Sequence, residues 1–252
     1  MKGLVLLKKE LREGLRTPKA VVLTLIFLFF GILNPITARY INEIISSAGG
    51  IEGFRLPDPT WIDAFMQFYK NSQSICFLAL ILTFMGTVVN EKRSGTMVLM
   101  LSKGAKRGTF IYAKFSAAAI FYTIAYVIGA SVTVLYTYLL FDNVNPDKLT
   151  LALLVYWLTG LFYIAVAMLA SVLAKTVTSA AIISLAGYFL VSAMGAIPQI
   201  KKFTPSFLTE TSSSLLTGKG WPDGAYLNIS VVILMIIILL KTSVIVLKRQ
   251  EM

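Results

Sequence analysis

Polar side chains with a recognisable spacing gather in one stretch, Glu91 to Phe115, which we call the basic segment. Its sequence is EKRSGTMVLMLSKGAKRGTFIYAKF, in which six Lys and Arg residues accompany one acidic residue, Glu91. Apolar runs long enough to cross a bilayer lie on both sides of it. Because basic loops between membrane spans are retained in the cytoplasm, the charge pattern predicts a cytoplasmic location for this segment. The side chains of this segment are suited to binding a partner through their charge and shape.

Part of the basic segment has the pattern of a short amphipathic helix. Met97, Met100 and Leu101 fall at i, i+3 and i+4, which places them on one helical face. The hydroxyl of Ser94 or Thr96 can accept hydrogen bonds from the free N–H groups of a first helical turn. A short capped helix held between two membrane spans is well placed to receive force from a soluble partner.

The order E-x-x-x-G-T, leucine-rich residues, a basic residue and a Lys before the next span resembles the permease subunits of ABC transporters, type-2 exporter class. The matching residues are Glu91, Gly95, Thr96, Leu99, Leu101, Arg107 and Lys114. The resemblance implies a coupling helix that docks in a groove of a separate ATPase subunit. The implied coupling residues are Glu91, Ser94, Gly95, Thr96, Met97, Met100, Leu101 and Arg107. An ordinary basic cytoplasmic loop is the alternative interpretation.

The composition excludes several kinds of catalytic site. Histidine is absent, the single cysteine is Cys76 within an apolar run, and no G-x-x-x-x-G-K-[ST] phosphate loop occurs. We therefore expect no catalytic residue, metal or cofactor in this chain, with ATP and Mg bound by the partner ATPase. A membrane enzyme would lack identifiable catalytic groups. Secondary transporters usually carry charged residues near the centres of their spans, and the spans of this chain have none there. If the chain were an assembly protein, the residue pattern of the basic segment would have no explanation.

The composition predicts an all-α integral membrane protein with one domain, 1–252. Hydrophobic residues make up 57% of the chain and charged residues 14%, against about a quarter charged in soluble proteins. Six stretches suit the length of a membrane span, namely 20–36, 72–89, 115–141, 149–173, 177–197 and 227–247. Between them we expect external segments at 37–71 and 198–226 and a cytoplasmic coupling segment at 90–114.

Residues 1–19 repeat leucine at helical spacing, with cations on the other faces. Leu4, Leu7, Leu11 and Leu15 form the apolar face. This pattern predicts a helix that lies in the membrane interface. A cleaved signal peptide is the alternative, although no small-x-small cleavage site follows Ile36.

The distribution of charge predicts the topology. Most Lys and Arg residues fall on the side of the termini and the basic segment, whereas most acidic residues fall on the other side. We therefore expect a multi-pass protein of the cell membrane with both termini cytoplasmic. Because the cations flank apolar runs, lipid headgroups account for them better than nucleic acid does.

Hydroxyl and phenol groups within the spans form the candidate translocation path. These residues are Thr83, Thr87, Tyr122, Tyr126, Ser131 and Thr133. Interhelical hydrogen bonding is the alternative role for each of them. From the resemblance we expect an exporter in which this chain pairs with itself or with a homologous permease above two ATPase subunits. An apolar, aromatic path favours an amphipathic peptide or a hydrophobic toxic compound, and sodium extrusion is the alternative.

Overall fold

The computed structural model describes residues 2–47, 57–102, 104–142, 144 and 147–250, and every regular element within them is a helix. Part of the expected external segment, residues 48–56, lies outside the described residues. In chain order the elements are α1 (Lys2–Arg16), α2 (Pro18–Arg39), α3 (Ile41–Ser47), α4 (Trp61–Asn71), the π-helical turn η1 (Ser72–Cys76), α5 (Phe77–Phe84), α6 (Val89–Arg93), α7 (Thr96–Ser102), α8 (Arg107–Leu140), α9 (Leu149–Leu173), α10 (Val177–Gly195), α11 (Pro198–Lys201), α12 (Ser206–Leu216) and α13 (Ala225–Arg249).

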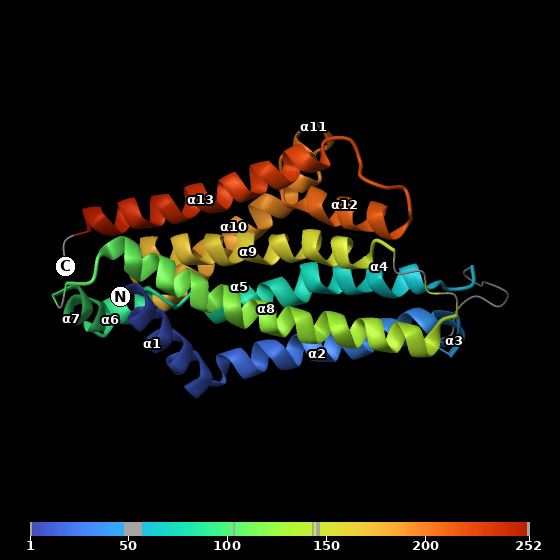
Figure 1. Ribbon diagram of the computed structural model, residues 1–252, viewed down its shortest axis with the longest axis horizontal. Coiled ribbons are helices and arrows are strands. Elements are labelled where there is room, and N and C mark those ends of the chain that lie inside the picture. The colour runs from blue at the N-terminus through green and yellow to red at the C-terminus, as the bar shows by residue number, and fades with distance from the viewer. Residues whose placement is uncertain (1, 48–56, 103, 143, 145–146, 251–252) are drawn as a thin grey trace.

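Six helical stretches of the described chain are long and apolar enough to cross a membrane. They are Pro18–Arg39, Trp61–Arg93, Arg107–Leu140, Leu149–Leu173, Val177–Gly195 and Ala225–Arg249. The long helices run side by side along one axis, as Figure 1 shows. The prediction of an all-α integral membrane protein is confirmed.

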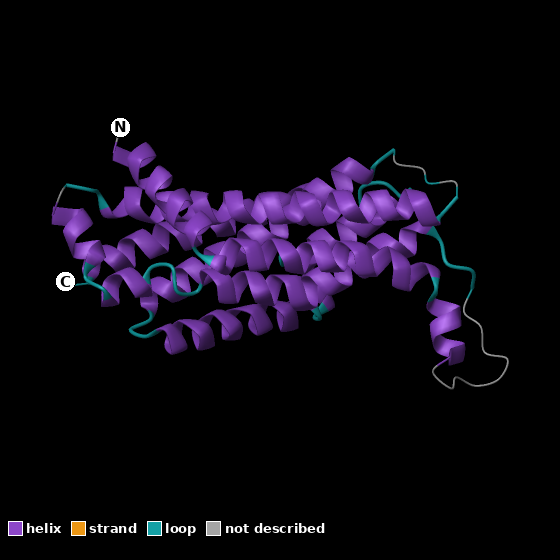
Figure 2. Ribbon diagram, turned by 90° about the horizontal axis from the view of Figure 1, so that it is seen from below, coloured by secondary structure: helices purple, strands orange, loops and turns teal. Residues whose placement is uncertain are grey.

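Both chain ends lie at the same end of the helix bundle as α6 and α7 in Figure 1, and Figure 2 shows the two ends of the chain together from another side. We call this end of the molecule the terminal end. The helix α1 also lies there and meets α2 at Thr17, where Pro18 begins the new helix. Because proline has a fixed φ and no N–H to donate, it suits the first turn of a helix. This junction turns the chain from α1 into the first membrane-spanning helix.

Two glycines bring the backbones of α2 and α8 into direct contact. A Cβ atom added at Gly31 would lie 2.6 Å from the backbone oxygen of Gly129, and one added at Gly129 would lie 2.8 Å from the oxygen of Phe27. Distances this short leave no room for a side chain. The two backbones therefore touch through their glycines, a mode of packing common between membrane helices.

The second membrane-spanning stretch begins at Trp61, ahead of the expected start at residue 72. Phe65 and Phe68, one helical turn apart, are fully buried in the core of the bundle. The wide turn η1 then joins α4 to α5 without interrupting the stretch. At the end of α4, the Asn71 side-chain amide donates a 2.5 Å hydrogen bond to Asn34 Oδ1 of α2. Aromatic burial thus extends the helix beyond the strictly apolar run.

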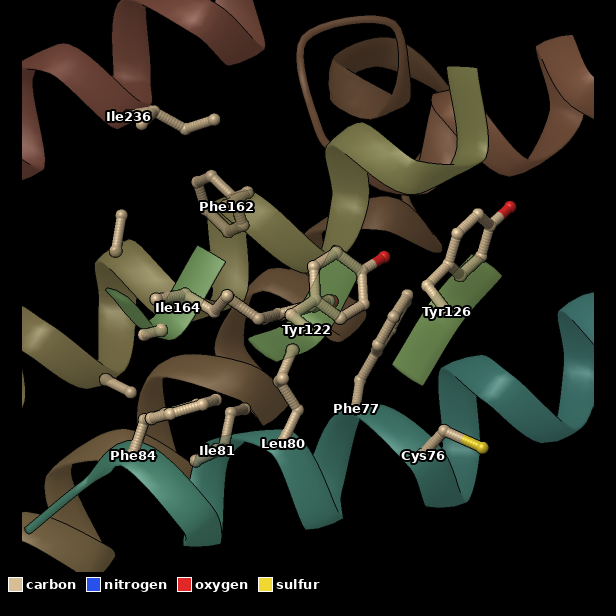
Figure 3. Close-up of a cluster of buried hydrophobic side chains, with 14 of the residues drawn as sticks. Cys76, Phe77, Leu80, Ile81, Phe84, Tyr122, Tyr126, Phe162, Ile164 and Ile236 are labelled. Carbon is tan, nitrogen blue, oxygen red and sulfur yellow. The ribbon is translucent and has the colours of Figure 1, made fainter. Parts of the chain in front are cut away.

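The core between the helices is rich in aromatic rings. Phe77 of α5 contacts Tyr156 and Tyr163 of α9, with ring centroids 5.6 and 5.4 Å apart. Figure 3 shows Phe77 beside Tyr122 and Tyr126 of α8. Rings at such distances pack favourably beyond the burial of their area. The core between α5, α8 and α9 is therefore largely aromatic.

Residues 198–226 contain the two short helices α11 and α12. The helix α12 buries Leu208, Ser212 and Leu215, and it lies along α9. The side-chain amide of Asn228, in α13, donates hydrogen bonds to the backbone oxygens of Lys202 and Thr204, at 2.9 and 2.8 Å. The segment therefore folds back onto the bundle between the last two long helices.

Candidate functional site

The basic segment folds as two short helices joined by a tight turn. The helix α6 ends at Arg93, α7 begins at Thr96, and Gly95 between them has a φ of 72°. The Oγ atoms of Ser94 and Thr96 lie 2.9 Å apart at this turn. A positive φ strains residues with a Cβ, whereas glycine adopts it freely. The Gly95 position therefore requires glycine for its backbone conformation.

Replacing Gly95 tests this requirement. A Cβ there would meet no atom within 4 Å, so the cost of substitution comes from the φ angle alone. We expect G95A to destabilise the turn by about 1–2 kcal/mol and G95N to cost less, because asparagine tolerates this conformation. Thermal unfolding in detergent measures both variants. Equal losses of stability in G95A and G95N would contradict the role of φ.

The predicted helix lies at Thr96–Ser102, but its apolar face points into the protein. Met97 is 1% exposed, and Met100 and Leu101 are partly buried against the core. Val98 and Leu99 lie on the other side and are 45% and 63% exposed. The spacing that identified the helix marks the side that packs on the membrane helices. The accessible apolar side is the one formed by Val98 and Leu99.

A buried ion-pair cluster lies directly beneath this helix pair. Lys114 of α8 is 2% exposed, and its Nζ lies 2.8 Å from Glu10 Oε2 of α1 and 2.8 Å from Glu91 Oε1 of α6. Both carboxylates are buried as well. Buried charges remain ionised only where each has a close opposite partner. The cluster therefore holds α1, α6 and α8 together by charge.

Two further residues of α1 extend the cluster towards the surface. The Lys9 ammonium lies 2.5 Å from Glu91 Oε1 and 3.0 Å from Glu13 Oε2. Burial acts to lower the pKa of Lys9, but the hydrogen bonds that its ammonium donates to Glu91 and Glu13 outweigh burial and raise that pKa above its usual value. Burial likewise acts to raise the pKa of Glu13, and the contact with Lys9 lowers it overall. Both shifts favour the charged pair.

Three carboxylates of the cluster lie close enough to hold a metal ion. One oxygen each of Glu10, Glu13 and Glu91 lies within 4.8 Å of the others. However, the ammonium groups of Lys9 and Lys114 already contact these carboxylates at 2.5–3.0 Å. Two cationic groups therefore occupy the position that a metal ion would need.

Other cations of the basic segment bind the carbonyl groups at helix ends. Lys92 Nζ donates to the backbone oxygens of Val172 and Ala174 at the end of α9, at 2.7 and 3.2 Å. Arg107 Nη1 donates to the oxygens of Leu247 and Lys248 at the end of α13, at 2.6 and 2.7 Å. The last carbonyls of a helix have no partner within the helix, and a cation there also suits the helix dipole. The basic segment is thereby bound to the ends of two membrane helices, α9 and α13.

The Arg107 contacts give a testable expectation. We expect R107M to leave the last carbonyls of α13 without their cation and to cost about 1.5–3 kcal/mol locally, the range for hydrogen bonds to charged groups. Hydrogen exchange followed by mass spectrometry should show faster exchange over residues 243–249. The exposed Arg93→Met variant is the control. Unchanged exchange in R107M would show that the capping contributes nothing.

The six residues of the candidate path differ in burial and in hydrogen-bond partners. Thr83 and Thr87 line a pocket of about 110 Å³ beside the ion-pair cluster, and each hydroxyl donates to a carbonyl of its own helix stretch. The hydroxyls of Tyr122 and Tyr126 donate to the backbone oxygens of residues 157 and 153 in α9. Ser131 is exposed.

The sixth residue, Thr133, is buried and donates to the oxygen of Gly129. The role of these six side chains in a translocation path stays a prediction. The hydrogen bonds of the buried members fit the alternative role, in which they hold helices and helical turns together.

Two important residues were missed by reasoning from the sequence, Glu10 and Lys92. Glu10 lies at i+3 from Leu7 and precedes Gly14 by four residues, so helical periodicity places all three on one face. An acidic residue on that face of an otherwise basic helix was the available signal. The role of Lys92 had no such signal, because its carbonyl partners are 80 and 82 residues away.

Comparison with known proteins agrees with the residue pattern of the basic segment. The family described as ABC-2 family transporter protein matches residues 4–206. The chain is also 23% identical over 217 residues to the uncharacterized transmembrane protein YxlG of Bacillus subtilis (strain 168), a match that covers 84% of each chain. The family match spans most of the chain and confirms the resemblance. The chain belongs to the ABC-2 transporter family and is a membrane subunit of an ABC transporter.

Proposed function

We propose that this chain is the permease subunit of an ATP-driven exporter and that α6 and α7 form its coupling element. The observation that carries the proposal is the geometry of the terminal end. There a helix pair displays Val98 and Leu99 outward, while Glu91, Lys92 and Arg107 bind the membrane helices behind it. A partner that moves this pair must therefore also move the ends of the membrane helices.

The partner that fits this surface is an ABC ATPase. The exposed apolar tip of α7 suits an apolar groove, in the helix-in-groove mode of recognition. Exposed cations at Arg93 and Lys106 flank the tip and favour acidic residues on the rim of that groove. The ATPase would bind ATP and Mg, since no phosphate-binding loop occurs in this chain.

The proposed orientation places the terminal end in the cytoplasm of the cell. Both chain ends and the basic segment lie there, and the excess of Lys and Arg on this side follows the positive-inside rule. This orientation puts α7 in the same compartment as ATP.

The complex would contain two permeases and two ATPases. In the most apolar stretches of α10 and α13, only 17% and 22% of the residues are buried within the chain. The outer faces of these two helices therefore need lipid or another permease to cover them. Pairing of this chain with itself or with a homologous permease would supply part of that cover. The path would then lie between two chains.

For the substrate we propose an amphipathic peptide or a hydrophobic toxic compound. The helices present apolar and aromatic surfaces, and the described carboxylates Glu10, Glu13 and Glu91 are engaged by lysines. A bare sodium ion crossing such a surface would lose its hydration without replacement. Sodium extrusion is therefore the second candidate.

The first experiment is purification of the chain from its host in mild detergent, with a search for a bound ABC ATPase. The proposal predicts a stable complex in mild detergent and ATP hydrolysis by it. Recovery of the chain without any ATPase in several mild detergents would contradict the assignment of the coupling element.

The second experiment addresses the substrate. The complex in lipid discs should hydrolyse ATP faster with amphipathic peptides or hydrophobic drugs than without them. Sodium and potassium salts at constant ionic strength are the comparison. Stimulation by sodium alone would replace the proposed substrate with the ion.

A further inference from the structure

One carboxylate oxygen of the ion-pair cluster is buried without a donor in the described part of the chain. Glu91 is 6% exposed, and its Oε1 atom contacts both Lys9 and Lys114. Its other oxygen, Oε2, has no hydrogen-bond partner among the described residues. A buried carboxylate oxygen without a donor is unfavourable, because it has lost its hydration and gained no hydrogen bond in exchange. Glu91 therefore favours a ligand that donates a hydrogen bond to Oε2.

A pocket of about 110 Å³ lies at this carboxylate, and we call it the polar pocket. Its walls come from α1, α2, α5, α6 and α8, and they include Glu13, Lys19, Thr83, Glu91 and Phe121. Glu13 and Lys19 are exposed, whereas Glu91 is buried. The polar pocket therefore extends from the surface of the chain to the buried carboxylate.

The charges of the polar pocket suit a ligand that carries both signs. In the ion-pair cluster, the carboxylates Glu10, Glu13 and Glu91 outnumber the ammonium groups of Lys9 and Lys114 that contact them, which leaves an excess of negative charge. Lys19 lines the same pocket with an exposed positive charge. A ligand with an ammonium group next to a phosphate group matches this arrangement, since each of its charges meets an opposite one.

The neighbourhood of the polar pocket corresponds to the headgroup level of a membrane. Lys19 and Ala20 belong to the first turn of the first membrane-spanning helix, and Thr83 lies in the last turn of α5. Next to these lining residues, the apolar side chains of Val21 and Leu82 are exposed. A lysine at the end of a span reaches the lipid headgroups, and exposed apolar side chains of a span contact acyl chains. The ligand that fits this position is therefore a phospholipid.

We infer that the polar pocket binds a phospholipid whose headgroup carries a primary ammonium group, as in phosphatidylethanolamine. The ammonium donates a hydrogen bond to Glu91 Oε2 and balances the excess of negative charge, while the phosphate contacts Lys19. A choline headgroup has the same phosphate, but its nitrogen carries no hydrogen that it can donate. Glu91 therefore distinguishes the two headgroups. This lipid site does not rest on the proposed function, because it requires no ATPase and no transported substrate.

Native mass spectrometry of the purified chain tests the lipid site. The chain is incubated in mild detergent with equal amounts of dioleoylphosphatidylethanolamine and dioleoylphosphatidylcholine. We expect it to retain the first lipid at least about tenfold more than the second, the effect of one hydrogen bond to a charged group. Equal retention of the two lipids, or retention of neither, would overturn the inference. Binding of free phosphoethanolamine in place of the lipid would overturn the membrane as the source of the ligand.

Variants assign the lipid preference to the polar pocket. E91Q replaces one carboxylate oxygen by an N–H donor and should bring the retention ratio to about one. E210Q, which alters an exposed ion pair outside the pocket, is the matched control and should keep the preference. Because E91Q also changes the ion-pair cluster, T83L provides a second variant, which fills the pocket with apolar atoms and keeps every charge. A preference that persists in either E91Q or T83L would overturn the assignment.

The contact with the phosphate is tested separately by K19Q. Both lipids carry the phosphate, so we expect K19Q to weaken the retention of both by a similar factor and to leave their ratio unchanged. Unchanged retention of both lipids in K19Q would overturn the part of the inference that concerns Lys19.

Discussion

Replacing Val98 and Leu99 together by aspartate is expected to abolish binding of the ATPase while the chain still inserts and folds. These side chains are the exposed apolar pair of α7, so the change removes little packing within the chain. In a complex, however, two carboxylates would be buried in an apolar groove without partners. Unpaired buried charges cost several kcal/mol, and each 1.4 kcal/mol weakens binding tenfold. We expect affinity to fall by more than about a hundredfold.

The measurement is the amount of ATPase that co-purifies with the variant, together with the rate of ATP hydrolysis. The T217D variant, which adds charge at an exposed position beyond α12, is the control for charge alone and should bind normally. The same substitution at Met100 and Leu101 would be a poor test, because both side chains pack against the core of this chain. Normal binding by the Val98 and Leu99 variant would show that the ATPase docks elsewhere.

Removing the buried ammonium should cause the largest loss of stability. In K114M, Glu10 and Glu91 both lose their buried partner and keep only the half-exposed Lys9. Breaking a buried pair by removing one partner typically costs about 3–5 kcal/mol. We expect a clearly lower thermal unfolding midpoint in detergent.

The control for K114M is an ion pair at the surface. Lys201 and Glu210 lie 2.6 Å apart with side chains 39% and 47% exposed, so K201M should cost less than about 1 kcal/mol. The triple variant K114M/E10Q/E91Q should recover part of the loss, since it removes the stranded charges. Equal midpoints for K114M and K201M would contradict the structural role of the cluster.

The sequence predicted what depends on local pattern. Continuous apolar runs identified the spans, and the spacing of Met97, Met100 and Leu101 identified α7. Helical spacing defines which residues share a face, but the direction of that face depends on neighbours far away in the chain. For that reason the pattern could not show that Met97 points inward or that Leu99 is accessible.

The ion-pair cluster depends almost entirely on long-range contacts. Glu10 and Lys114 are 104 positions apart, and nothing in either local sequence marks them as partners. The same limit applies to Tyr126, whose hydroxyl finds a carbonyl 27 positions away, although its place within a span was clear. The span to which each residue belongs could be predicted from the sequence. Which residues far apart in the chain would contact each other depends on the fold.

The glycine contact between α2 and α8 has a consequence for the synthesis of the protein. Gly31 leaves the ribosome 98 residues before Gly129, its neighbour in the finished bundle. At about 5–20 residues per second, α2 waits roughly 5–20 s in the membrane before its main packing partner exists. During the first part of that interval the side chain of Asn34 is without Asn71, which follows 37 positions later. The first span must therefore remain inserted by its own hydrophobicity until the rest of the bundle arrives.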